Sequence, residues 1–166
     1  MKKHLPVWGV GPVYAVICAL LTAAGIIARN LGWLESGAVP AWDVPMTIAG
    51  VILLLAGAYL YYEAHLRTKL FDHVRSNHLI TTGVYAWVRN PVYAAVMLIC
   101  TGLLLMAYNL WLLILPPVFW GLMTAMLIPT EEKWLHDLYG EEYAAYCRRV
   151  NRCIPWPPCF RRTTAE

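Results

Sequence analysis

The chain has 166 residues, of which 60% are hydrophobic and only 14% are charged. An average soluble domain has roughly 45–50% apolar and about 25% charged residues, so this composition indicates an integral membrane protein. The net charge of +3 is explained by the membrane topology given below, and it is no evidence for a nucleic-acid-binding protein.

Four apolar segments are long enough to cross a bilayer, so the sequence predicts an all-α membrane protein with a single domain over residues 1–166. In chain order the expected spans are Val7–Ala28, Pro45–Tyr62, Val92–Tyr108 and Leu110–Ile128. The shortest reaches only ~26 Å at about 1.5 Å per residue, against a hydrocarbon core of ~30 Å. The first segment is too long for a signal-peptide core and lacks a clean cleavage site, which favours a retained span.

Basic residues predict the orientation of these spans. Every Lys and Arg except Arg29 lies at the N-terminus, between the second and third spans, or in the tail. The positive-inside rule assigns that side to the cytosol, so both termini should be cytosolic. We expect a bacterial or archaeal cytoplasmic membrane.

Small residues and prolines suggest how the spans pack. Gly50 and Gly57 in the second span could contact another helix of the same chain or a second copy of the protein. We favour packing within the chain, with a homo-oligomer as the alternative. Pro116 and Pro117 fall inside the fourth expected span, where they should kink the helix or free backbone carbonyls, either beside other helices or a cavity or as a purely structural bend.

The third span begins with a strong helix-start signal. Asn90 can cap the first free amides, and Pro91 suits the first helical position. The positive end of this helix would then face the cytosol, where it could bind an anion. The alternative is that Asn90 only caps a helix entering the membrane.

A cytosolic segment over residues 130–155 follows the last span and is predicted to be helical and amphipathic. Thr130 should cap its first helix and place Glu131 and Glu132 in the first turn, where the helix dipole alone could explain both carboxylates. Gly140 predicts a break into two short helices. The apolar face could lie on the membrane or fold back over the loop before Tyr93.

The cysteines support neither a disulfide framework nor a metal site. There are five of them, an odd number, and none has the C-x-x-C spacing.

Polar motifs follow one another in a specific order over residues 77–155. They are Thr-Gly-x-Tyr at Thr82, Arg-x-Pro-x-Tyr at Arg89, a helical hairpin, Glu-Glu at Glu131, Tyr-Gly-x-Glu-Tyr-x-x-Tyr at Tyr139, and Ile-Pro at Ile154. In this order the chain resembles the integral-membrane methyltransferases of the isoprenylcysteine carboxyl methyltransferase and phospholipid methyltransferase group. The resemblance implies S-adenosylmethionine as methyl donor, S-adenosylhomocysteine as product, and a lipid-like or small hydrophobic acceptor drawn from the membrane.

The resemblance also implies the residues of the site. Arg89 and Glu131 are the expected catalytic residues. The expected donor contacts are Asn77, His78, Leu79, Ile80, Tyr85, Asn90, Pro91, Tyr93 and Glu131.

Two positions depart from the family pattern. Asn90 stands where the family often has His, and Leu127 stands where the prenylcysteine enzymes have an Arg that faces the substrate. The second departure leaves the identity of the acceptor open.

Two other classes of function are alternatives. One is a membrane reductase of the steroid-reductase type that uses NADPH. The other is a non-catalytic helical module, although the expected spans carry no ionisable residue at mid-depth that would mark an ion path.

Overall fold

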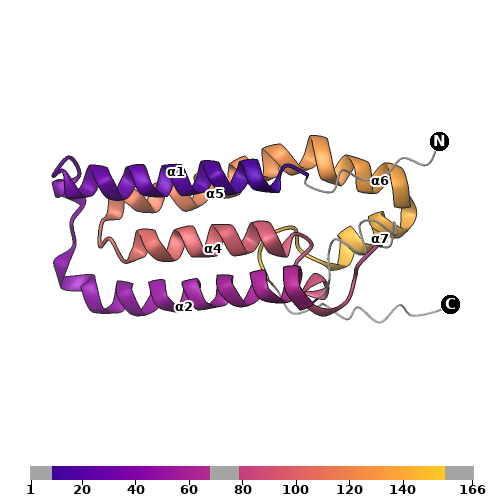
Figure 1. The fold of residues 1–166 in the computed structure, drawn as a ribbon, viewed down its shortest axis with the longest axis horizontal. Helices are drawn as coiled ribbons and strands as arrows, with labels where there is room; N and C mark the ends of the chain where they lie inside the picture. The colour runs from indigo at the N-terminus through magenta and orange to yellow at the C-terminus, as the bar shows by residue number, and fades with distance from the viewer. Residues whose placement is uncertain (1–8, 68–78, 156–166) are drawn as a thin grey trace.

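A computed structural model describes residues 9–67 and 79–155, and over these ranges the chain is helical and contains no strand. Four helices run antiparallel along the long axis: α1 (Gly11–Asn30), α2 (Asp43–Tyr62), α4 (Pro91–Leu105) and α5 (Leu115–Leu127), as Figure 1 shows. Beyond α5, α6 (Lys133–Tyr139) extends the same line, and α7 (Glu141–Arg149) turns back toward α4. The start of α1 and the start of α4 therefore lie at the same end as α6 and α7.

Three of the four expected spans are confirmed by length and composition. Long apolar helices cover Gly11–Asn30, Pro40–His65 and Leu110–Tyr139, whereas α4 is an apolar helix of only 15 residues. The expected third span was therefore too long. Its helix ends at Leu105 because the backbone turns over the next residues, where Tyr108 has a φ of 46°.

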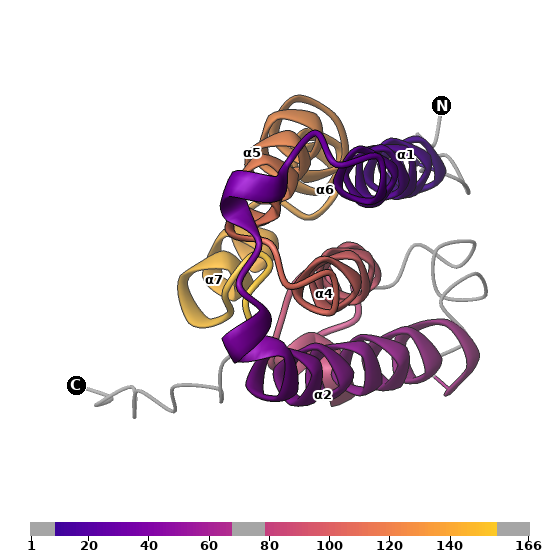
Figure 2. The ribbon, with the colours of Figure 1, turned by 90° about the vertical axis from the view of Figure 1, so that its left-hand side faces the viewer.

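The short helix α4 lies between α1, α2 and α5 (Figure 2), and glycines bring α2 against it. A Cβ added to Gly50 would lie 2.7 Å from the carbonyl oxygen of Gly102, and one added to Gly57 would lie 2.8 Å from that of Ala95. Only glycine permits so close a helix contact. These small residues thus pack within the chain, as we favoured from the sequence.

This packing predicts that Gly102→Ala destabilises the helix bundle. The new Cβ would lie 2.6 Å from the carbonyl oxygen of Gly50, which cannot move without moving α2. Overpacking of this kind costs about 1–3 kcal/mol. Gly121→Ala in α5 is the matched control, because its Cβ would meet nothing within 4 Å. We expect a lower unfolding temperature in detergent for the first variant only; equal temperatures would contradict this account of the contact.

The two prolines of the last span begin a helix instead of kinking one. A 3₁₀ turn covers Leu110–Ile114, and α5 then starts at Leu115 with proline in its first turn. At these positions proline removes no helical hydrogen bond, because the first amides of a helix have no partner within it. The expectation of a kink in mid-span was therefore wrong.

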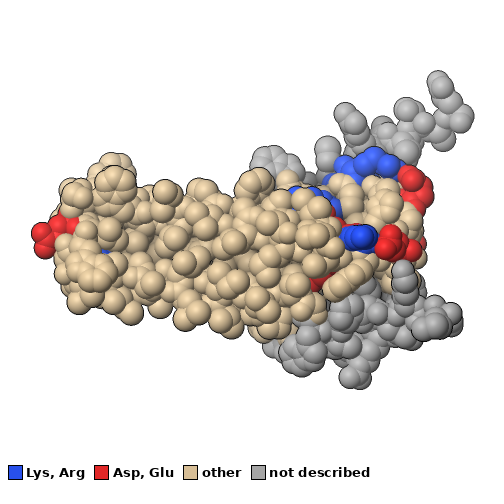
Figure 3. Space-filling view, turned by 90° about the horizontal axis from the view of Figure 1, so that it is seen from above, with Lys and Arg blue, Asp and Glu red and all other residues tan. Residues whose placement is uncertain are grey.

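Charged side chains gather at the end of the molecule that holds α6 and α7, and the long flank between the two ends shows no charged side chain on the face that Figure 3 draws. The protein is therefore an integral membrane protein whose polar end lies outside the hydrocarbon core. The described residues of the expected donor site, among them Tyr85, Tyr93 and Glu131, belong to this polar end.

Candidate active site

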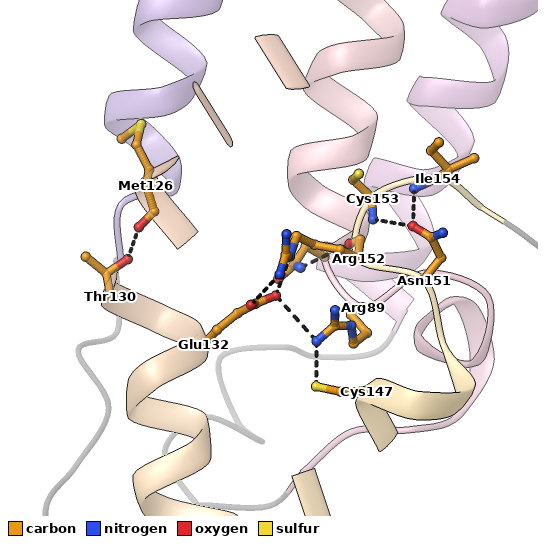
Figure 4. Close-up of polar contacts among 10 residues, drawn as sticks. Arg89, Met126, Thr130, Glu132, Cys147, Asn151, Arg152, Cys153 and Ile154 are labelled. Carbon is orange, nitrogen blue, oxygen red and sulfur yellow. Dashed lines mark hydrogen bonds and ion pairs between the residues drawn. The ribbon is translucent and has the colours of Figure 1, made fainter. Parts of the chain in front are cut away.

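The two adjacent glutamates lie within a continuous helix that leaves the bundle. A π-helical turn over Ile128–Glu132 joins α5 directly to α6. Thr130 donates its hydroxyl to the carbonyl oxygen of Met126, one turn earlier (Figure 4), and does not cap a new helix. The expected helix start at Thr130 was wrong, because the helix simply continues through this position.

Glu131 connects the start of α4 with the start of α1. The Tyr93 hydroxyl donates to Oε1 of Glu131 at 2.5 Å, and the Val10 amide donates to the same oxygen at 3.0 Å. Of the expected site residues, the structure thus brings Tyr93 and Glu131 into direct contact, although they are 38 positions apart.

Glu132 points to a different set of partners. Its carboxylate accepts from Arg152 Nε at 2.7 Å and Nη2 at 3.0 Å, and it lies 3.4 Å from Nη1 of Arg89 (Figure 4). The side chains of Arg89 and Glu132 are only 10% and 13% exposed. Two guanidinium groups thus share one buried carboxylate, which leaves the cluster one positive charge in excess. The hydrogen bonds that Arg152 donates to Glu132 raise the pKa of Arg152.

Arg89 also contacts α7. Its Nη1 donates to the Sγ of Cys147 at 2.5 Å, and no described residue accepts from its buried Nε. A buried guanidinium nitrogen without an acceptor is unfavourable. Arg89 is therefore held by its charge pairing with Glu132, while part of its hydrogen-bonding capacity stays unused within the described residues.

The residues just before α4 pair with the chain that follows α7. The Arg89 amide donates to the Asn151 carbonyl at 2.8 Å, and the Asn90 amide donates to the Arg152 carbonyl at 3.1 Å. The Asn90 side chain donates to that same Arg152 carbonyl at 3.0 Å. Helix α4 begins at Pro91 as predicted, but Asn90 does not cap it, because its amide group is turned toward the tail.

The C-terminal helix folds back over the loop before α4. Tyr146 donates its hydroxyl to the Tyr85 carbonyl at 2.6 Å, and Leu79 packs against a buried cluster of Tyr143, Tyr146 and Val150. Burial raises the pKa of both the Tyr85 and the Tyr146 phenol, so both are neutral hydrogen-bond donors at physiological pH. Of the two alternatives for the amphipathic face, the structure has the one that covers the loop.

The remaining expected site residues are spread between the core and the undescribed part of the chain. Asn77 and His78 lie outside the described residues. Ile80 packs against the cluster that contains Val84 and Tyr85, and Pro91 is fully buried. Leu127, which replaces the family arginine, is fully buried in a different apolar cluster. No cation could sit at that position without desolvation.

Several residues of this region were not singled out from the sequence. They are Gly9, Val10, Cys147, Asn151 and Arg152. Gly9, Gly11 and Pro12 mark the start of α1 in the sequence, but they do not indicate a contact with Glu131. The tail residues gave no signal, because their role depends on contacts with segments 20 to 62 positions away.

Comparisons with known proteins identify the family to which the chain belongs. The family described as "Phospholipid methyltransferase" matches residues 45–142. The protein-S-isoprenylcysteine O-methyltransferase of Saccharomyces cerevisiae is 33% identical over 118 residues, which are 66% of this chain and 49% of that protein. The enzyme of the same name from Schizosaccharomyces pombe is 29% identical over 113 residues, which are 63% of this chain and 48% of that protein.

A third relative of the same name, from Xenopus laevis, is 27% identical over 126 residues, which are 67% of this chain and 41% of that protein. The chain thus spans about half the length of these curated relatives. They are eukaryotic, which contradicts the expectation of a bacterial or archaeal membrane. No solved structure is a significant match to the chain.

Proposed function

Because the chain belongs to the phospholipid methyltransferase family, we propose that it transfers a methyl group from S-adenosylmethionine to a lipid-like acceptor at the cytosolic membrane face. The main support is the contact between Tyr93 and Glu131, which joins two motifs of the family resemblance at the polar end of the bundle. Neither a steroid-type reductase nor a non-catalytic module is favoured by the family match.

The described residues fit this donor. Both described hydrogen bonds to Glu131 end on Oε1, so Oε2 is not engaged by any described residue and can accept from a hydroxyl or amino group. No side chain caps the start of α4, and an uncapped helix start suits a carboxylate. The expected roles of Tyr85, Asn77 and His78 as donor contacts belong to this proposal.

When bound, S-adenosylmethionine supplies a methyl group attached to a positively charged sulfur. The nucleophile of the acceptor attacks the methyl carbon in line with the carbon–sulfur bond, and S-adenosylhomocysteine leaves. The chain itself needs to bind the donor and the acceptor, orient them and exclude water from the site. Together these effects lower the activation barrier by several kcal/mol. A carboxylate or thiolate acceptor requires no general base. Glu132 is poorly suited to that role in any case, because two guanidinium groups already share its charge.

The names of the curated relatives point to an isoprenylcysteine acceptor, methylated on oxygen. This chain lacks a cation at Leu127, so a carboxylate acceptor would depend on another positive group. Among the described residues, the candidate for this positive group is the pair of Arg89 and Arg152, which carry one positive charge in excess beside Glu132. The catalytic role of Arg89 is part of this proposal.

A labelled-methyl assay tests the function. The purified protein is incubated with methyl-labelled S-adenosylmethionine and whole-membrane lipid extract, and in a parallel reaction with a synthetic prenylcysteine. We expect protein-dependent label in an organic-soluble product and inhibition by S-adenosylhomocysteine. A thermal shift with NADPH and none with S-adenosylmethionine would instead indicate a reductase, and no response to either would favour a non-catalytic module.

A further inference from the structure

The start of helix α1 touches the glutamate expected to bind the methyl donor. Val10 occupies the N-cap position of α1. Its backbone amide donates to Oε1 of Glu131, which lies 121 positions further along the chain. The preceding residue, Gly9, has a φ of +44°, and a Cβ added there would lie 2.1 Å from the same oxygen. Gly9 thus lets the backbone approach the carboxylate at a distance that no side chain would allow.

Helix α1 also fixes the other partner of Glu131. The rings of Tyr14 and Tyr93 pack with their centroids 5.4 Å apart. Tyr14 is fully buried, and its hydroxyl donates to the Phe119 carbonyl in α5 at 3.3 Å. Tyr93 is only 6% exposed. The hydroxyl that donates to Glu131 is therefore held in place by a ring from α1.

These contacts constrain Glu131 through one oxygen only. The Val10 amide and the Tyr93 hydroxyl both donate to Oε1, and no described residue donates to Oε2. A carboxylate fixed at one oxygen keeps a single orientation, and its second oxygen can accept two more hydrogen bonds.

We propose that the start of α1, through Gly9 and Val10, positions Glu131 for the methyl donor and so forms part of the donor site. The inference rests on the proposed function and extends it to a helix outside the family match, which covers residues 45–142. Gly9 and Val10 are positioning residues: they act on the donor through Glu131. Glu131 then presents Oε2 to a hydroxyl or amino group of the donor.

A purely structural role has to be distinguished from this one, because Glu131 could serve only to cap α1. In that case a displaced carboxylate lowers stability and leaves donor affinity unchanged. If the start of α1 positions Glu131, a displaced carboxylate lowers donor affinity by more than the change in unfolding temperature accounts for.

The test is Gly9→Ala in the whole 166-residue chain, with calorimetric affinity for S-adenosylmethionine and unfolding temperature without donor as readouts. Gly32→Ala is the matched control. Gly32 also has a positive φ, +81°, and its added Cβ would lie 3.0 Å from a carboxylate oxygen of Glu35, in the connection after α1.

We expect Gly9→Ala to weaken donor binding at least tenfold, and Gly32→Ala to bind within about twofold of the wild type. Tyr93→Phe removes the second hydrogen bond to Oε1 and should also weaken binding. The double variant Gly9→Ala/Tyr93→Phe should lose less affinity than the product of the two single losses, because both act on one carboxylate.

Unchanged donor affinity in Gly9→Ala, or a loss equal to that of Gly32→Ala, would overturn the inference and leave the methyltransferase proposal standing. Fully independent effects of Gly9→Ala and Tyr93→Phe would overturn it as well. A wild-type protein that binds no donor would overturn both proposals.

Discussion

Glu131→Gln is expected to lower the affinity for S-adenosylmethionine by about 100-fold, or ~2.7 kcal/mol. Glutamine keeps the shape of the side chain but removes the charge and replaces one acceptor oxygen by a donor. Hydrogen bonds to a charged group are worth about 1.5–3 kcal/mol, so the loss of one or two accounts for this change. The structure ties Glu131 both to the start of α1 and to α4.

Glu141→Gln is the matched control for this prediction. Glu141 is an exposed glutamate of the same C-terminal segment, and its hydrogen bond with Arg148 lowers its pKa. Titration calorimetry on both purified variants gives the comparison. Equal donor affinity of Glu131→Gln and the wild type would remove Glu131 from the donor site, whatever the unfolding temperatures.

Glu132→Ala is expected to have the largest effect on stability. The substitution leaves Arg89 and Arg152 facing each other without the carboxylate that they share. Removing one partner of a buried ion pair costs about 3–5 kcal/mol, because the remaining charge is desolvated and unpaired. We therefore expect a markedly lower unfolding temperature and faster proteolysis of the C-terminal segment, since Arg152 also carries the carbonyl that pairs with Asn90.

Arg148→Ala provides the reference for this second prediction. Its ion pair with Glu141 is exposed, with side-chain exposures of 66% and 81%, and water and salt screen such pairs so that they add little to stability. Thermal unfolding of both variants in one detergent allows a direct comparison. If Glu132→Ala unfolds no earlier than Arg148→Ala, the cluster does not anchor the tail.

Features set by local chemistry could be predicted from the sequence. Apolar length located α1, α2 and the helix that leads to the glutamates, and Pro91 marked the start of α4. Gly140, with its φ of 52°, separates α6 from α7 as its residue type indicated. In each case the signal lies within one or two turns of the feature that it determines.

Features set by distant contacts could not be predicted in this way. Asn90 has the residue type of a helix cap, but a carbonyl 62 positions away engages its side chain. Thr130 also has the type of a cap, but α5 and α6 are continuous around it. The contact between α1 and Glu131 spans 121 positions, and no local sequence pattern predicts it.

The π-helical turn at Ile128–Glu132 connects the part of the site beside α1 with the part beside the chain that follows α7. Neighbouring carboxylates on one short stretch of backbone serve two separate tasks, one beside α1 and the other beside the tail. A twist of this stretch moves both at once. Because both carboxylates are fixed to one helical turn, we expect a substitution at Arg152 to alter the hydrogen bond between Glu131 and Tyr93.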